Sequence, residues 1–158
     1  HPKTLEPLLK KDIPLYIRSF INHEKTGTLV SNFKIKPSLP CYMVKKNQIL
    51  LTFLKKKYYS FFSEQDISNI LKYIAKYFLK IGLLHNSVVD LNICINDTYH
   101  INDIIKKLSL KYKIQILEKV SLYTVYHYNN NCIEEFVKNK IIILSKITLE
   151  TAQYIIKD

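Results

Sequence analysis

Glycine is nearly absent from this chain of 158 residues, in which only Gly27 and Gly82 occur, far apart. A loop that cradles phosphates needs several glycines close together, because only a residue without a Cβ lets the backbone approach the phosphate oxygens. The chain therefore contains no phosphate-binding glycine loop, and a nucleotide site of that kind is excluded within these residues.

Long apolar runs are also absent. No run reaches the roughly 18 to 20 residues that span a bilayer, and the first residues lack the basic, apolar and small-residue pattern of a secretion signal. A hydrophobic content of 47% with 23% charged residues is typical of a globular protein with a buried core, in one ordinary domain or two small ones. We therefore expect a cytoplasmic protein with no membrane partner.

Cysteine is scarce and poorly spaced for a site. Cys41, Cys94 and Cys132 are an odd number, far apart, without a Cys-x-x-Cys pair, which favours reduced, buried thiols over disulfides or zinc. The histidines are equally scattered. His85 and His127 lie in predicted strands with no nucleophile at a defined spacing, so structural roles are favoured. We predict no catalytic residue and no metal ligand.

Acidic residues are few, 13 against 24 lysines and arginines, which gives a net charge of +11. Such a charge suits a nucleic-acid partner. However, nearly all of the excess is lysine, beside abundant Asn, Ile, Tyr and Phe, the mixture that A/T-rich codons produce. The lysines stand in short, separated groups, such as 45–46, 55–57 and 106–107. A solvated lysine surface is the favoured interpretation, and a functional basic patch is the alternative.

Proline is absent after residue 40, and all five prolines lie within the first 40 residues. This break in composition, with Lys-Pro-Ser-Leu-Pro at 36–40, predicts a linker and a domain boundary near residue 38. Ahead of it, a buried-looking strand at 13–17 runs into Arg18, the only arginine, and a Gly-Thr turn follows at 27–28. The pattern is typical of the end of a domain, although it lies near the start of the chain.

Residues 47–118 have a regular order of elements. The apolar run 48–54 predicts a buried strand. A helix is predicted over 63–80, with Ser63 and Asp66 as a capping box. Gly82 follows, and we expect it where a side chain would be obstructed. The apolar stripe of the helix comprises Ile67, Ile70, Leu71, Ile74, Tyr77 and Phe78.

Two strands are predicted over 83–97, around a turn at Asn86–Ser87, and a helix over 100–112 and a strand over 113–118 follow. The order strand-helix-strand-strand-helix-strand predicts a ferredoxin-like α+β module, an antiparallel sheet with both helices on one face. In its third strand, alternation predicts a buried face and a wet face. The buried face is Val89, Leu91, Ile93 and Ile95, and the wet face is Val88, Asp90, Asn92 and Cys94.

A shorter βαββ pattern follows, with strands over 120–128, 140–146 and 151–157 and a helix over 131–139. Compared with the first module it lacks a helix and a strand, which leaves an open sheet edge. We expect the segment 41–46 to fill that edge. The first module, 47–118, is then inserted into a second one made of 41–46 and 119–158.

These residues resemble the C-terminal part of aspartokinases. His-Pro-Lys-Thr at 1–4, Ile-Pro-Leu-Tyr-Ile-Arg-Ser-Phe at 13–20 and Gly-Thr at 27–28 are similar to the closing segment of the kinase domain, with Asn22-His23 where the family usually has Asn-Pro. The remainder resembles paired ACT modules, and 127–157 is similar to the short terminal module of Bacteroidetes-type monofunctional enzymes. The resemblance assigns 1–37 to the kinase tail, with motif residues His1, Pro2, Lys3, Thr4, Arg18, Ser19, Gly27 and Thr28.

The resemblance implies an enzyme that uses ATP and magnesium to phosphorylate the aspartate β-carboxylate, the entry to lysine, threonine and methionine biosynthesis. The family's lysine-glycine-glycine motif is missing, so we expect this chain to be inactive alone, without a cofactor, as a regulatory fragment or gene remnant. The resemblance also implies a homodimer formed through the ACT modules. Lysine or threonine would then act as an effector that shifts the population of dimer arrangements.

ACT modules hold an amino acid between the start of the first helix and the entry to the second strand, across a dimer interface. Helix amides can bind its α-carboxylate. Capping alone also explains Ser63 and Asp66, and turn formation also explains Asn86 and Ser87. Lysine-sensing relatives tend to carry Asp or Asn at Gly82, so we expect weak or lost effector binding. The candidate effector residues are Ser63, Gln65, Asp66, Ile67, Gly82, Asn86 and Ser87.

Two alternatives to an effector-binding module are open. One is a basic ferredoxin-like module that binds RNA on its sheet, with the aromatic residues of 58–62 stacking on bases beside lysines 55–57. No RNP-like motif occurs, so packing is the favoured role of these aromatic residues and we predict no nucleic-acid partner. The other is a ligand-free dimerisation remnant, which Gly82 favours.

Overall fold

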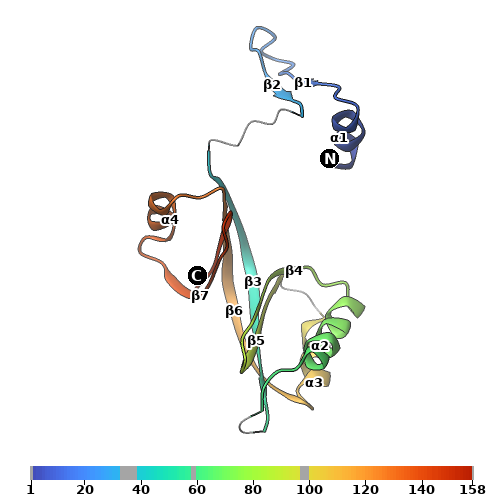
Figure 1. Ribbon diagram of the computed structural model, residues 1–158, viewed down its shortest axis with the longest axis vertical. Coiled ribbons are helices and arrows are strands. Elements are labelled where there is room, and N and C mark those ends of the chain that lie inside the picture. The colour runs from blue at the N-terminus through green and yellow to red at the C-terminus, as the bar shows by residue number, and fades with distance from the viewer. Residues whose placement is uncertain (1, 33–38, 58–59, 97–99, 158) are drawn as a thin grey trace. The chain divides into compact units, whose positions relative to one another are not determined.

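The computed structural model describes residues 2–32, 39–57, 60–96 and 100–157 (Figure 1). The chain forms two compact units, His1–Pro37 and Ser38–Asp158. Most of the linker predicted at 36–40 lies outside the described residues. Among the helices of the described part, none has the length and apolar character needed to cross a bilayer.

The first unit consists of helix α1 (Pro2–Lys10) and an antiparallel ribbon of strands β1 (Leu15–Ile17) and β2 (Thr28–Val30). The β1 strand is not buried as expected, because Tyr16 is 59% and Ile17 is 53% exposed. A two-stranded ribbon and one short helix supply too little surface to cover an apolar strand on both sides.

The second unit is a six-stranded sheet with the order β4-β5-β3-β6-β8-β7, in which every neighbouring pair is antiparallel. This sheet with its helices confirms the predicted α+β class. The order β4-β5-β3-β6 is the one that a ferredoxin-like module requires. The strands are β3 (Cys41–Lys55), β4 (Ile81–Asn86), β5 (Asp90–Asn96), β6 (Tyr112–Tyr126), β7 (Ile141–Ile147) and β8 (Thr151–Lys157).

Strands β3 and β6 run the length of the sheet, with 15 residues each. One half of β3 pairs along 50–55 with residues 112–117 of β6, and the other half pairs along 41–45 with residues 122–126. The register shifts between these halves, where Asn47 and Lys119 have φ values of 53° and 54°. The segment 41–45 therefore lies on the sheet edge that the shorter βαββ pattern leaves open in the sequence.

Helices α2 (Glu64–Lys76) and α3 (Ile101–Leu108) lie together on one face of β5 and β3, whereas α4 (Asn130–Val137) lies at the other half of the sheet (Figure 1). Helix α2 is shorter than predicted. It ends before Phe78, which has a φ of 54° and is 92% exposed, so this residue is not part of the apolar stripe. The core beneath the helices includes Leu51, Phe53, Ile70, Ile74, Ile93 and Ile104.

Two residues of β5 on the face that we predicted to be wet are buried instead, since Asn92 is 7% and Cys94 is 0% exposed, whereas Val88 is exposed as predicted. Cys94 belongs to a second core on the sheet face away from α2 and α3. Lys146 of edge strand β7 donates a hydrogen bond of 3.2 Å to the carbonyl oxygen of Leu84 in edge strand β4. The sheet therefore curls and closes this face on itself. The second core is formed by Leu50, Leu83, Cys94, Val120, Leu122 and Ile155.

Val89 was assigned to the buried face of the same strand and is 55% exposed. Strand β5 begins only at Asp90, so Val89 lies in the preceding turn, outside the alternation on which the assignment depended.

Candidate functional site

The N-terminus of α2 is closed by the predicted capping box. The Asp66 backbone N–H donates to Ser63 Oγ at 3.3 Å, and Asp66 Oδ2 accepts from the Ser63 N–H at 3.0 Å and from Ser63 Oγ at 2.7 Å. Two first-turn donors are thus satisfied by side chains, and the carboxylate lies at the positive end of the helix dipole. The prediction for Ser63 and Asp66 as capping residues is confirmed.

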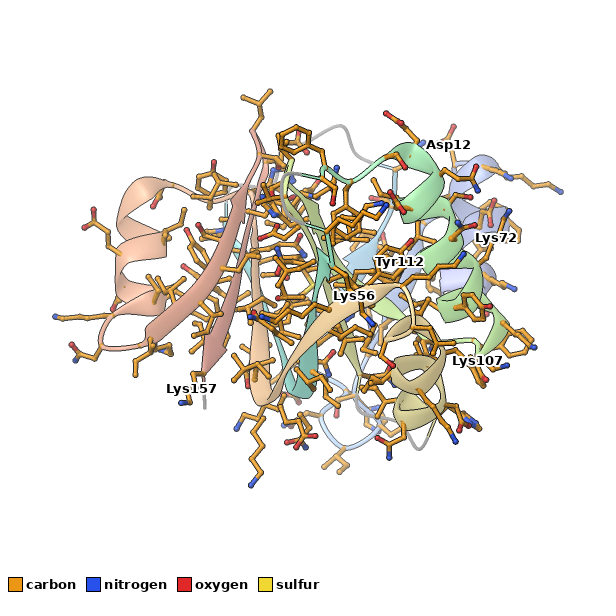
Figure 2. The ribbon with its side chains drawn as sticks, turned by 90° about the horizontal axis from the view of Figure 1, so that it is seen from below. Asp12, Lys56, Lys72, Lys107, Tyr112 and Lys157 are labelled. Atoms are coloured by element: carbon orange, nitrogen blue, oxygen red, sulfur yellow. The ribbon has the colours of Figure 1, made fainter. Side chains whose placement is uncertain are left out.

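Two residues that the sequence analysis did not single out complete this cluster. Lys55 forms an ion pair with Asp66 Oδ2, and the Tyr112 hydroxyl donates to Asp66 Oδ1 at 2.9 Å. Lys55 Nζ lies 5.8 Å from the ring centre of Phe62 and 5.9 Å from that of Tyr112. In Figure 2, Tyr112 lies between the sheet and α2. Lys55 and Tyr112 are paired across strands β3 and β6. Their proximity depends on this strand register, which the sequence alone does not give.

The cluster changes the acidity of its members. Burial alone would raise the pKa of Asp66, but hydrogen bonds from Lys55, Ser63 and Tyr112 hold this pKa well below its usual range. Burial and the hydrogen bond to the Asp66 carboxylate raise the pKa of Tyr112 to about 12. Asp66 is therefore an anion whose lone pairs are already used within the chain.

The turn between β4 and β5 lies beside the start of α2, because the Phe62 N–H donates to the carbonyl oxygen of Val88 at 3.1 Å. Ser87 Oγ donates to Asp90 Oδ1 at 2.7 Å and accepts from the Asp90 N–H at 3.1 Å. Asn86 is exposed. The structure thus brings Asn86 and Ser87 to the same end of the module as Ser63, while the Ser87 hydroxyl is occupied in the turn.

Gly82 lies four residues before Asn86 on β4, which corresponds to about 13 Å along a strand. A Cβ at this position would lie 2.7 Å from Leu122 Cδ2 and 3.7 Å from the carbonyl oxygen of Cys94. Both neighbours belong to the second core, on the sheet face opposite α2. The expected obstruction at Gly82 is therefore confirmed, but within one chain Gly82 does not join the cluster at Ser63 and Asp66.

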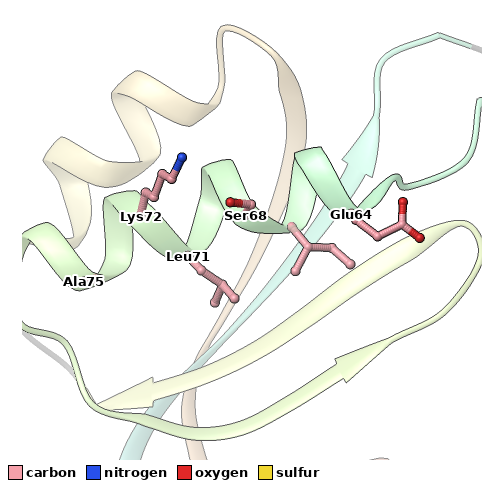
Figure 3. Close-up of a pocket in the computed structure, with 6 residues that line it drawn as sticks. Glu64, Ser68, Leu71, Lys72 and Ala75 are labelled. Carbon is pink, nitrogen blue, oxygen red and sulfur yellow. The ribbon is translucent and has the colours of Figure 1, made fainter.

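The remaining two candidate effector residues, Gln65 and Ile67, lie in different surroundings. Gln65 is exposed, and its Nε2 donates to Asn69 Oδ1 at 3.1 Å. Ile67 lines a groove of about 550 Å³ along α2, and Figure 3 shows Leu71 of this groove directed toward the β4–β5 hairpin. The groove has an apolar floor with polar groups at its rim. Its lining residues are Glu64, Ile67, Ser68, Leu71, Lys72 and Ala75.

Comparison with known proteins gives no family model and no curated protein that matches the sequence. Solved structures do match. The chain resembles E. coli aspartokinase III in complex with lysine and aspartate (T-state), with a TM-score of 0.74 and 19% identity over 99% of this chain and 38% of that one. For Clostridium acetobutylicum aspartate kinase the TM-score is 0.82, with 16% identity over 99% and 41%.

A C-terminal regulatory domain of aspartate kinase from Porphyromonas gingivalis also matches, with a TM-score of 0.63 and 12% identity over 75% of this chain and 86% of that domain. The fold is that of an aspartokinase regulatory region. The chain spans about two fifths of the length of the whole aspartokinases, with 38% and 41% covered. The resemblance noted in the sequence is thus confirmed at the level of the fold.

The residues that resemble the aspartokinase kinase tail all belong to the first unit. His1 lies outside the described residues, and Pro2, Lys3 and Thr4 begin α1. Arg18 and Ser19 follow β1, where Ser19 Oγ accepts from the backbone N–H groups of Ile21 and Asn22, both at 3.2 Å. Gly27 has a φ of 74°, and a Cβ would collide with the carbonyl oxygen of Ile17, so only glycine fits before Thr28.

The three cysteines differ in burial and form no common site. Cys94 is buried as expected, and burial raises its pKa to about 11, whereas Cys41 is exposed and Cys132 half-buried. The expectation of buried thiols was therefore wrong for Cys41, because its end of β3 has an open face. In the described part of the chain, no three His, Cys, Asp or Glu side chains gather as metal ligands would.

Proposed function

We propose that this chain is the regulatory ACT portion of an aspartate kinase, preceded by the last segment of the kinase domain. The observation that carries the proposal is a match over 99% of the chain to whole aspartokinases, at TM-scores of 0.74 and 0.82. In this proposal residues 1–37 are the kinase tail, 47–118 the first ACT module, and 41–46 with 119–158 the second.

The parent enzyme uses ATP and magnesium to phosphorylate aspartate in the cytoplasm, and this region regulates it. An E. coli relative has been solved with aspartate and ADP, which supports this chemistry. The present residues hold no glycine-rich phosphate loop, so their contribution is binding rather than phosphoryl transfer. A coupling free energy of about 1–3 kcal/mol between effector and kinase sites is enough to change affinity about 5- to 150-fold.

The proposed effector is lysine or threonine, bound at the end of the module where Ser63 and the Asn86–Ser87 turn meet. The E. coli enzyme solved with lysine supports an amino-acid effector. Asp66 already binds Lys55, Ser63 and Tyr112, so its carboxylate is not free to bind the ligand's amine. Binding should therefore be weaker than in a module with a free acid at this position.

Calorimetry on the purified chain tests the effector. We expect saturable heat on titration with lysine or threonine, and none with a short single-stranded RNA. Heat with RNA but with neither amino acid would replace the proposal by an RNA-binding module. A dimer without heat from any of the three would indicate a dimerisation remnant.

A homodimer is part of the same proposal. The outer edge of β4 has no strand partner in the described sheet, and the groove formed along α2 by Ile67, Leu71 and Ala75 lies beside it. Apart from the bond from Lys146 to Leu84, this edge is not paired in the described sheet, and Ile67 and Leu71 beside it are half-buried. Such a surface suits an isologous contact, in which the same surface of a second copy covers both the edge and the apolar row.

Replacing Leu71 by arginine tests this dimer. The change places a charge in the contact, so we expect light scattering after size exclusion to give twice the chain mass for the wild type and the single mass for Leu71→Arg. Leu110→Arg is the matched control, because Leu110 is 78% exposed, and it should remain dimeric. A wild-type monomer at micromolar concentration, or equal behaviour of both variants, would contradict the proposed interface.

A further inference from the structure

Lysine groups that are separate in the sequence meet at one end of the first module. Lys55 ends β3 and Lys56 and Lys57 follow it, lysines 106–107 lie in the last turn of α3, Lys111 precedes β6, and Lys113 is its second residue. The strand register pairs Leu54 with Lys113, and Lys56 Nζ donates to the carbonyl oxygen of Leu110 at 3.3 Å. Figure 2 labels Lys56 and Lys107 in the view from below.

A hollow of about 460 Å³ lies within this group, lined by Leu54 and by four lysines, Lys55, Lys56, Lys57 and Lys113. We call it the basic hollow. It shares no lining residue with the groove along α2.

The charges of the basic hollow are largely uncompensated. The charge of Lys55 is compensated, because its ammonium group is paired with Asp66 and lies near the rings of Phe62 and Tyr112. Among the described residues, the ammonium groups of Lys56, Lys57 and Lys113 have no carboxylate within 4.0 Å. Three like charges on residues that line one hollow repel one another, and a bound anion lowers that repulsion.

We propose that the basic hollow binds a chain of linked phosphates, as in inorganic polyphosphate or the triphosphate of a nucleotide. A single exposed ammonium contributes little to the binding of one anion, because water screens the pair. A ligand with several adjacent charges contacts several lysines at once, and lysine is an effective point-charge partner for phosphate. This site goes beyond the proposed effector function and does not depend on it.

Titration of the full chain with sodium tripolyphosphate, without magnesium, tests the proposal by calorimetry. We expect saturable binding that weakens as salt is raised. The triple variant Lys56→Gln, Lys57→Gln and Lys113→Gln should bind about tenfold more weakly, the effect expected from the loss of three partly screened charge pairs.

The matched control removes three exposed lysines elsewhere, by Lys76→Gln, Lys138→Gln and Lys157→Gln, and its affinity should change by less than about twofold, because these lysines lie away from the hollow and act only through screened, long-range charge. Circular dichroism checks that both variants are folded. Equal losses in the two triple variants would overturn the proposal, since binding would then follow net charge alone, and so would the absence of wild-type binding.

Titrations with two further ligands, orthophosphate and ATP, show which chemical group the basic hollow binds. Orthophosphate should bind far more weakly than tripolyphosphate, and equal affinities would overturn the requirement for linked phosphates. ATP that binds as tightly as tripolyphosphate indicates recognition of the phosphate chain alone, and tighter binding indicates an added contact to the nucleoside. Binding of ATP without binding of tripolyphosphate would overturn the proposal, because the phosphates would not be the recognised group.

Discussion

Replacing Leu122 by alanine is expected to lower the free energy of unfolding by about 2–5 kcal/mol. Leu122 is 1% exposed and lies in the second core. There it packs with Leu50 and Leu83 from the first half of the sheet and with Ile155 from the other half. Truncation leaves a cavity at the place where the two halves meet, so both should lose stability together.

Urea unfolding followed by far-ultraviolet circular dichroism and by tyrosine fluorescence measures this effect, since the chain has 12 tyrosines and no tryptophan. For the second unit we expect the two probes to give coincident transitions, both in the wild type and in the Leu122→Ala variant. Leu149→Ala is the control, because Leu149 is 100% exposed and such changes stay within about 0.5 kcal/mol. Two separate transitions, or equal losses in both variants, would show that the halves do not share this core.

A shared core has a consequence for regulation. Strands β3 and β6 each run through both halves of the sheet, and the second core links the same halves through side chains. In the proposed function, an effector that reorders one half would therefore act on packed elements that continue into the other. Packed elements that have two alternative arrangements are one physical carrier of coupling between distant sites.

The fold was largely predictable because its signals are local. Hydrophobic patterns placed α2, α3, α4 and the strands β4, β5, β7 and β8, and the break in proline usage lies at the boundary between the units. Strands β3 and β6 were each predicted as two separate segments, whereas each is one continuous strand of 15 residues. The errors at Val89 and Phe78 came from element boundaries, and the other errors in burial came from tertiary effects. Alternation along β5 could not reveal that Asn92 and Cys94 are covered when the sheet curls, and the composition of 13–17 did not reveal how little surface the first unit has to bury Tyr16 and Ile17.

In the candidate site, too, local contacts were predictable from the sequence and tertiary contacts were not. The capping box of Ser63 and Asp66 was predictable because its residues are three positions apart. The contacts of Asp66 with Lys55 and Tyr112 depend on the register of two distant strands, which one sequence does not contain. The basic hollow was missed for the same reason, because its lysines form separate groups in the sequence. Gly82 carried a steric signal, but the sequence did not show which sheet face its side chain would occupy.

Replacing Asp66 by alanine is expected to lower the free energy of unfolding by about 2–4 kcal/mol. The capping interaction contributes about 1 kcal/mol, and the Lys55 ammonium and Tyr112 hydroxyl lose a partner that is only 14% exposed. Glu64→Ala is the matched control. It removes an acid from the same first turn, but Glu64 is exposed, so we expect a loss of less than about 1 kcal/mol.

The pH dependence of this difference tests its electrostatic origin. The folded-state pKa of Asp66 lies below the unfolded value, which is about 3.9 for aspartate. The folded chain thus binds fewer protons at this site, so the stabilisation is fully present above about pH 4 and is lost as the pH falls toward the folded-state pKa. The stability gap between wild type and Asp66→Ala should therefore narrow as the pH falls from about 4 to about 2.5. A gap that stays constant over this range would mean that packing, and not the ionised carboxylate, holds Lys55 and Tyr112 at the start of α2.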